Sequence, residues 1–212
     1  MRLYSFFRSS ASFRVRIALN LKGVDYETVP VGLPQDEHRK AAFLAVNPQA
    51  TVPTLDDDGV VLAQSLAIIE YLDARFPVPR LIPSEPVARA RVQWLAQLIA
   101  CEIHPLNNLR VRRHLAGELG LDDAAVERWQ RHWIAEAFGP LEALVARWSG
   151  GRHCFGDAVS VADVCLVPQV YNARRVACDL TPYPTLVRIA DDLAREPAFA
   201  RAAPEAQPDA GN

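Results

Sequence analysis

Residues 8–16 read Arg-Ser-Ser-Ala-Ser-Phe-Arg-Val-Arg, and the rest of the chain is interpreted outward from this stretch. A short apolar run at residues 3–7 precedes it, and Val15, Ala18 and Leu19 follow at the i, i+3, i+4 spacing of a helix. This order predicts a strand, a hydroxyl-rich turn and a helix that stops near Gly23. The serines then lie at the first helical turn, where free backbone N–H groups favour an anion such as a thiolate. The alternative is a simple helix cap, the commonest use of such residues.

The composition is that of an ordinary globular protein, because 50% of the 212 residues are hydrophobic and 23% are charged. A formal charge of −2 and the lack of a basic run argue against nucleic acid or a membrane surface as partner. The N-terminal apolar run is too short for a signal peptide, and no stretch approaches a membrane span of roughly 20 apolar residues. A cytoplasmic protein is expected. The four cysteines form no C-x-x-C pair, so free, mostly buried thiols and no metal site are expected.

The first 76 residues predict a compact α/β unit in the order strand, helix, strand, helix, hairpin, helix. The second helix is expected at residues 36–46, with His38 on its solvated side. Asp57-Asp58-Gly59 is a strong hairpin turn. Ser65 is expected to cap the third helix, and Asp73 is expected on that helix's polar face.

The composition changes at residues 77–86, where four prolines in ten residues predict a stiff linker. Everything beyond it has helical periodicity, and Ser160-Val161-Ala162-Asp163 resembles a capping box that opens an apolar helix. The predicted domains are residues 1–78, a linker at 79–86, and an all-helical domain at 87–212. The small, polar residues 203–212 are expected to be loose.

Two further features of the first domain suit a peptide-like ligand. A cis Val52–Pro53 bond would turn the Val52 backbone towards an extended peptide, and an ordinary edge-strand proline is the alternative. Gln64 and Ser65, at a predicted helix start, offer an amide, a hydroxyl and backbone N–H groups to a carboxylate, and a simple cap is the alternative. Together with the serine turn they predict a groove for a small peptide-like thiol.

The chain resembles the zeta class of glutathione transferases, which includes the maleylacetoacetate and maleylpyruvate isomerases. Residues 9–19 match the S-S-C-S-x-R-V-R-I-A-L signature of that class. The other matching motifs lie at residues 47–48, 52–55, 64–72, 104–106, 162–163, 166–170 and 179–184, so that the resemblance covers nearly the whole chain. One departure is Ala11, which stands where the signature has cysteine. Chemistry that depends on that cysteine, including its covalent modification, is therefore not implied.

The resemblance implies a thioredoxin-like α/β N-terminal domain, an all-α C-terminal domain, a homodimer, and glutathione as cofactor. It implies that Ser9 and Ser10 stabilise the thiolate and are catalytic. The implied glutathione-binding residues are Ser9, Ser10, His38, Val52, Pro53, Gln64, Ser65, His104, Asn108 and Arg110. Arg175 matches the arginine of the family's substrate pocket and is expected to be catalytic and substrate-binding, and Arg8, beside the serines, is a second candidate. The alternative for both arginines is a solvated surface position.

The activity implied is the glutathione-dependent conversion of maleylacetoacetate to fumarylacetoacetate, by thiolate addition, bond rotation and elimination, in tyrosine breakdown. Maleylpyruvate, from gentisate-type catabolism, is the alternative substrate for the same reaction. A glutathione-conjugating transferase acting on halogenated small acids is another class of function. A non-enzymatic binding module with the same fold is a third class, and the intact serine, Val-Pro and Gln-Ser motifs argue against it.

Overall fold

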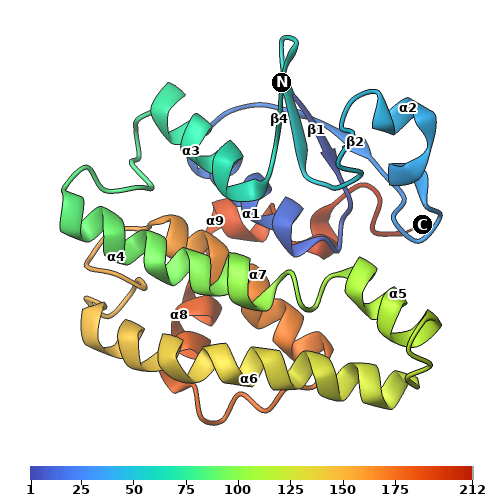
Figure 1. Cartoon of the computed structure of the whole chain (residues 1–212). Coiled ribbons are helices and arrows are strands. Elements are labelled where there is room, and N and C mark those ends of the chain that lie inside the picture. Colours follow the sequence, from blue (N-terminus) through green and yellow to red (C-terminus); the bar gives the residue numbers. More distant parts are fainter. Residues whose placement is uncertain (212) are drawn as a thin grey trace. The chain divides into compact units, whose positions relative to one another are not determined.

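A mixed four-stranded sheet belongs to the first of two units into which the chain divides (Figure 1). The computed structural model describes residues 1–211. Unit 1 comprises Met1–Arg80 together with Ala194 and the residues that follow it, and unit 2 comprises Leu81–Leu193. The segment that begins at Ala194 thus packs with the α/β unit, although it lies within residues 87–212, the predicted helical domain.

The sheet of unit 1 has the strand order β2-β1-β3-β4. Its strands are β1 (Arg2–Ser5), β2 (Glu27–Pro30), β3 (Thr54–Asp57) and β4 (Val60–Ala63). Strand β1 runs parallel to β2 and antiparallel to β3, and β3 runs antiparallel to β4. The predicted hairpin is confirmed, because Asp58 and Gly59 both have positive φ, 53° and 93°, as its tight turn requires. Leu3 and Leu55 face each other in the register and are fully buried.

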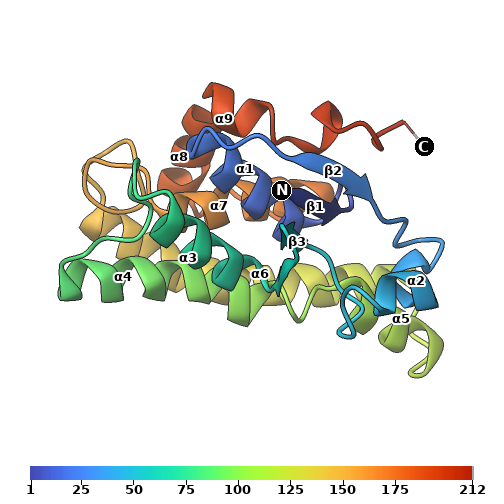
Figure 2. The same ribbon diagram turned by 90° about the horizontal axis from the view of Figure 1, so that it is seen from above.

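Helix α1 (Ser10–Leu21) is enclosed along most of its length, because every residue from Ser10 to Leu19 is buried. It packs against α3 (Ser65–Arg75) and against the short helix α9 (Pro197–Ala200). Figure 2 shows α9, in red, close to α1. The chain after α9 forms a short 3₁₀ turn, η3 (Pro204–Ala206), and Ala202 is fully buried. The expectation of loose residues 203–212 is wrong for the described part, since Pro204 and Gln207 are buried and Asp209 accepts a hydrogen bond from the Phe7 backbone N–H.

The second predicted helix differs from the expectation. It is divided into a 3₁₀ turn, η1 (Glu37–Arg39), and α2 (Ala41–Leu44), because Lys40 is extended with φ −74° and ψ 149°. His38 is not on a solvated side, since the residue is only 8% exposed.

Asp73 also lies elsewhere than expected, because it is buried against Lys22 and not on a polar face of α3. The Lys22 Nζ lies 2.6 Å from the Asp73 Oδ1, and the two side chains are 0% and 5% exposed. Lys22 also donates to the carbonyl of Pro79. The apolar periodicity of α3 gives no sign of this pair, because the partner comes from the end of another helix.

Unit 2 is built from helices, as predicted. They are α4 (Pro86–Gln97), the π-helix η2 (Leu98–Ile103), α5 (Leu109–Gly117), α6 (Asp123–Trp148), α7 (Val161–Arg175) and α8 (Pro184–Ala194). The interior helix is α7, because all residues from Val161 to Val170 are buried and the helix packs on α4 and η2. Within residues 1–211, no helix is both long enough and apolar enough to cross a membrane.

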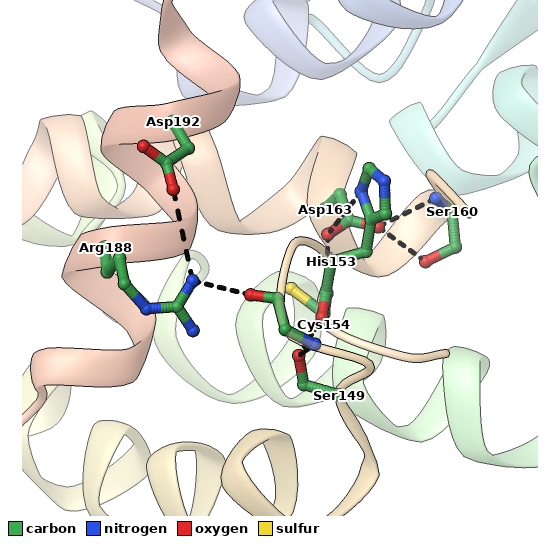
Figure 3. A network of polar contacts seen from close by, with 8 residues as sticks. Ser149, His153, Cys154, Ser160, Asp163, Arg188 and Asp192 are labelled. Carbon is green, nitrogen blue, oxygen red and sulfur yellow. Dashed lines mark hydrogen bonds and ion pairs between the residues drawn. The ribbon is translucent and has the colours of Figure 1, made fainter. Parts of the chain in front are cut away.

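The start of α7 is fixed by the buried carboxylate of Asp163 (Figure 3). It accepts hydrogen bonds from the Ser160 backbone N–H at 2.8 Å, the Ser160 hydroxyl at 2.9 Å and the Cys154 N–H at 2.7 Å. The predicted capping box is therefore confirmed. Burial raises the pKa of Asp163 and of the Cys154 thiol, so this cysteine is held in its unreactive protonated form.

The cysteines are free, and two of the four are buried. Cys154 and Cys165 are buried, Cys178 is half-buried and Cys101 is exposed. The expectation of mostly buried thiols thus holds for two positions, and it is wrong for Cys101, which lies on η2.

Candidate functional site

The serine-rich turn opens α1, and Ser9 is its N-cap. The Ser9 Oγ accepts a hydrogen bond from the backbone N–H of Ser12 at 3.2 Å, and the Ser9 hydroxyl proton remains available for donation to a ligand. Ser10 is the first helical residue and is 8% exposed. Ser12 is fully buried, and its hydroxyl has no hydrogen-bond partner among the described residues. Ser9 and Ser10 are therefore more accessible than Ser12 at this helix end.

The charge around this turn favours an anion. The first turn of the 12-residue α1 contains no acidic residue, so nothing opposes the positive end of the helix dipole. Arg8 is exposed directly before Ser9, and its guanidinium carbon lies 5.2 Å from the centroid of the Phe7 ring. Ala11 is buried in the same turn, so this helix start has no thiol of its own.

The second helix start differs from the expectation. Gln64 is the N-cap of α3, with φ 71° and ψ 115°, and Ser65 is the first helical residue. Ser65 is thus not the cap. Its Oγ accepts a hydrogen bond from the Arg14 Nη1 at 3.3 Å. Because Arg14 is buried in α1, this contact holds the beginnings of α1 and α3 side by side. Gln64 donates from its Nε2 to the Gln49 Oε1 at 2.9 Å.

The Val52–Pro53 peptide bond, directly before β3, is cis, one of the two forms that the sequence left open. Val52 is half-buried and Pro53 is buried. The buried Asn47 donates from its Nδ2 to the Thr51 carbonyl at 2.9 Å and to the Thr54 Oγ1 at 3.0 Å, and so fixes the loop before β3. This role of Asn47 was missed, although residues 47–48 are among the motifs that match the zeta class.

The strand register places the serine turn, Val52–Pro53 and Gln64 at one end of the sheet. Tyr4, Thr54 and Ala63 form one row across β1, β3 and β4. The serine turn follows β1, Val52–Pro53 precedes β3, and the Gln64 cap follows β4. All three therefore lie at the same end of the sheet. His38 follows β2, but it is buried and lies 3.9 Å from the Asp36 carboxylate.

The remaining candidates belong to unit 2. His104 follows η2, Asn108 caps α5, and Arg110 is exposed in the first turn of α5, so one connection carries all three. The Asn108 Oδ1 accepts the Arg110 backbone N–H at 3.2 Å, so the Asn108 side chain is engaged as a cap. Arg175 is the last residue of α7 and is exposed.

Two residues that sequence reasoning missed hold the connection from η2 to α5. The Trp129 indole donates to the Leu106 carbonyl at 2.9 Å, and the Asn107 Nδ2 donates to the Gln130 carbonyl at 3.3 Å. The only sequence signal of a polar role for Trp129 is the hydrogen-bond donor of its indole ring. These contacts fix the segment that carries His104 and Asn108.

The loop before Ser9 is also held by residues that the sequence analysis did not single out. Arg16 is fully buried, and its guanidinium donates to the Ser5 Oγ at 3.0 Å, the Phe7 carbonyl at 3.0 Å and the Ala202 carbonyl at 2.9 Å. Burial lowers the pKa of Arg16 to about 10, so the side chain is still charged at neutral pH. The Phe7 backbone N–H donates to the Asp209 Oδ2 at 2.9 Å.

The arrangement as a whole is chemically suited to an anionic, peptide-like ligand. Hydroxyl and backbone donors gather at two helix starts, and the half-buried Val52, followed by a cis peptide bond, precedes an internal strand. In the described chain, no group of three or more His, Cys, Asp or Glu side chains is placed to hold a metal ion.

Comparison with known proteins agrees with this description. Residues 8–75 match the glutathione S-transferase N-terminal domain family, and residues 123–200 match the glutathione S-transferase C-terminal domain family. The chain is 50% identical to a probable maleylacetoacetate isomerase of Vibrio cholerae over 98% of this chain and 97% of the relative. It is 51% identical to a maleylpyruvate isomerase of a Ralstonia species over 99% of both chains.

Solved structures with more than 40% sequence identity to this chain have the same fold. A holo maleylpyruvate isomerase, described as a bacterial zeta-class glutathione S-transferase, superposes with a TM-score of 0.97 at 49% identity, with 99% of both chains covered. A maleylacetoacetate isomerase of Methylobacterium extorquens AM1, with bound malonate and glutathione, has a TM-score of 0.92 at 43% identity, again with 99% of both chains covered. The predicted fold class is confirmed, and the chain belongs to the zeta class of the glutathione S-transferase family.

Proposed function

We propose that this protein is a glutathione-dependent cis–trans isomerase that converts maleylacetoacetate to fumarylacetoacetate. The observation that carries the proposal is the row across β1, β3 and β4, which gathers the serine turn, Val52 and the Gln64 cap at one end of the sheet. The relatives that match nearly the full length of this chain include maleylacetoacetate and maleylpyruvate isomerases.

The residues of unit 1 fit glutathione. Ser9 and Ser10 would hold the thiolate, because the Ser9 hydroxyl retains a proton to donate and no acidic side chain lies in the first turn of α1. The Val52 backbone would pair with the extended cysteinyl segment. Gln64 and Ser65 would hold the γ-glutamyl carboxylate. The Ser65 hydroxyl accepts a hydrogen bond from Arg14, so the hydroxyl proton of Ser65 is available for donation to the carboxylate.

Glutathione supplies a thiolate that adds reversibly to the conjugated cis double bond, so that rotation and elimination give the trans product and free glutathione. The protein's own task is to keep the thiol ionised and to orient a diacid. Arginine suits the second task, because its planar fork matches a carboxylate. Arg8, exposed beside Ser9, and Arg175, exposed at the end of α7, are the arginines that we assign to substrate carboxylates.

Maleylpyruvate is the second candidate substrate, because the identity to the Ralstonia maleylpyruvate isomerase is as high as that to the Vibrio relative. In both substrates the cis double bond lies between a carboxylate and a ketone. The test therefore compares the two side by side.

The experiment follows the ultraviolet absorbance of each maleyl substrate with and without catalytic glutathione. Glutathione-dependent formation of the fumaryl product, without consumption of thiol, is expected. Arg175→Ala is expected to lose activity, and Arg174→Ala is its matched control, because Arg174 is held by Asp191 through two hydrogen bonds of 2.7 and 3.0 Å. If glutathione binds but neither substrate is converted, the isomerase proposal fails and a conjugating transferase takes its place.

We infer further that the protein acts as a homodimer, with residues 1–78 as the glutathione-binding domain. The support is β4, an edge strand that leaves Val60 50% and Val61 43% exposed. Light scattering is expected to give twice the chain mass, and Val61→Lys is expected to shift the population towards monomer. A monomer mass for the unaltered protein would contradict this proposal.

A further inference from the structure

The C-terminal segment reaches the loop that carries Arg8 and Ser9. The Phe7 backbone N–H donates to the Asp209 Oδ2 at 2.9 Å, although the two residues are 202 positions apart in the chain. In Figure 2 the last segment of the chain, in red, runs on the side of the sheet where β2 is labelled. Nothing in the isomerase chemistry requires this contact directly, since Asp209 belongs to neither helix start.

Both polar groups of the Phe7 backbone are held by buried or half-buried partners. Its N–H is taken by Asp209, and its carbonyl accepts from the Arg16 Nη2 at 3.0 Å. The peptide planes on both sides of Phe7 are thereby fixed. Arg8 is the single residue between Phe7 and the Ser9 cap, and the Ser9 N–H closes a turn onto the Phe6 carbonyl at 2.9 Å.

The C-terminal segment is itself anchored to unit 1. Its Ala202 carbonyl accepts from the Arg16 Nε at 2.9 Å, and the Ala198 carbonyl accepts from the Asn20 Nδ2 at 2.8 Å. The Gln207 side chain donates to the Arg201 and Ala203 carbonyls, both at 2.9 Å, and so stiffens the turn that leads to Asp209. The carboxylate is thus presented to Phe7 by an ordered segment.

We propose that Asp209 is a positioning residue for the thiolate site: through the Phe7 N–H it sets the place of the Ser9 hydroxyl. This inference rests on the proposed function in so far as Ser9 is taken to meet the glutathione thiolate. A loop released at Phe7 still begins α1 at Ser9, but the hydroxyl then samples several positions. The expected result is a poorer hydrogen bond to the thiolate, with little change in the distant groups that bind the rest of glutathione.

Asp209→Ala removes the acceptor, whereas Asp209→Asn keeps an amide oxygen that accepts the same N–H. Asp25→Ala is the matched control, because it deletes one exposed acidic charge from the same unit. We expect about a tenfold loss of kcat in Asp209→Ala, with the KM for glutathione changed less than twofold, because a displaced catalytic group costs rate more than binding. Asp209→Asn and the control are expected to behave as the unaltered protein.

Two measurements that need no turnover complete the test. Hydrogen–deuterium exchange of the Phe7 amide in the free protein is expected to be faster in Asp209→Ala and normal in Asp209→Asn. Thiolate absorbance during a pH titration of bound glutathione is expected to show a higher thiol pKa in Asp209→Ala only.

The outcomes separate the two proposals. Fast exchange of the Phe7 amide in Asp209→Ala together with an unchanged thiol pKa would overturn the positioning role. An equal loss of kcat in Asp209→Ala and Asp25→Ala would also overturn it, and so would a loss of kcat in Asp209→Asn as large as that in Asp209→Ala. If Asp209→Ala does not fold, the inference is decided by Asp209→Asn against Asp209→Leu in the same exchange and titration measurements. Absence of isomerase turnover in the unaltered protein would contradict the proposed function. The hydrogen–deuterium exchange of the Phe7 amide and the titration of the glutathione thiol would still decide the role of Asp209.

Discussion

Replacing Ser9 by alanine removes two interactions of one hydroxyl, and the structure allows them to be measured separately. The Ser9 Oγ caps α1 by accepting the Ser12 N–H at 3.2 Å. Loss of such a cap costs about 1 kcal/mol of stability. In our proposal the same hydroxyl also donates its proton to the glutathione thiolate. Glycine at this position costs only a few tenths of a kcal/mol as a cap, yet it removes the hydroxyl as completely as alanine does.

The size of the catalytic effect follows from the lost hydrogen bond. A hydrogen bond to a charged group contributes about 1.5–3 kcal/mol, which corresponds to a rise of about one to two units in the thiol pKa. A thiol whose pKa is lowered by about two units from its ordinary value of about 8.5 is about 76% ionised at pH 7. When the hydrogen bond is lost and the pKa rises by about one or two units, the ionised fraction falls to about 24% or about 3%. The rate at pH 7 is therefore expected to fall about 3-fold to 25-fold in both variants.

The assay is the pH profile of kcat for Ser9→Ala, Ser9→Gly and Ser9→Thr, together with their stability in urea. Both hydroxyl-free variants are expected to lose rate at pH 7 and to regain most of it near pH 9, where the thiol ionises unaided. Only alanine is expected to lose stability, and threonine is expected to keep both properties. The reasoning would be refuted if Ser9→Gly kept the native rate, because the hydroxyl would then act only as a cap.

Three further predictions concern contacts away from the thiolate. Lys22→Met leaves the Asp73 carboxylate buried and unpaired, so urea unfolding is expected to show a loss of about 3–5 kcal/mol in the free energy of unfolding. The double variant with Lys22→Met and Asp73→Leu is expected to recover most of this free energy. If the losses of the two single variants add up in the double variant, the prediction is wrong. Trp129→Phe removes an indole hydrogen bond to the connection between η2 and α5, and is expected to lower the free energy of unfolding by about 1 kcal/mol in the same assay. An unchanged free energy of unfolding would show that this hydrogen bond does not hold the connection. The Gly59 backbone N–H and a neighbouring arginine hold the pKa of Asp56 below its usual value, so its contribution to stability is present above the ordinary aspartate pKa and is lost as the pH falls through the lowered one. Asp56→Asn is therefore expected to flatten the acid side of the thermal-midpoint profile, and an unchanged slope would contradict the assignment.

Features that depend on residues within a few positions of one another were predictable from the sequence. The Ser9 turn, the hairpin at Asp58-Gly59 and the capping box of Ser160 and Asp163 are each closed by local backbone geometry, and all three are present in the structure. The alternation of strands and helices in unit 1 followed from the same local signals. The family resemblance supplied the residue roles, which local patterns alone left open.

Features that depend on distant partners were not predictable. Asp73 was assigned to a polar face because its partner Lys22 lies 51 positions away. His38 was assigned to solvent because the extended Lys40 that interrupts the helix has no sequence signal. The candidate site itself depends on the row across β1, β3 and β4. Strand register is set by tertiary packing, so the three motifs could be recognised in the sequence, but their position at the same end of the sheet could not be predicted.

The C-terminal segment makes unit 1 discontinuous in sequence, and this fixes the order in which the protein is completed during synthesis. The chain emerges from the ribosome at about 5–20 residues per second, N-terminus first. Unit 2 is one continuous segment and is fully available once Leu193 has emerged. Helix α1 is made early, but the guanidinium of Arg16 receives its third acceptor only when Ala202 follows. The half of the protein that is translated first is therefore the half that is finished last.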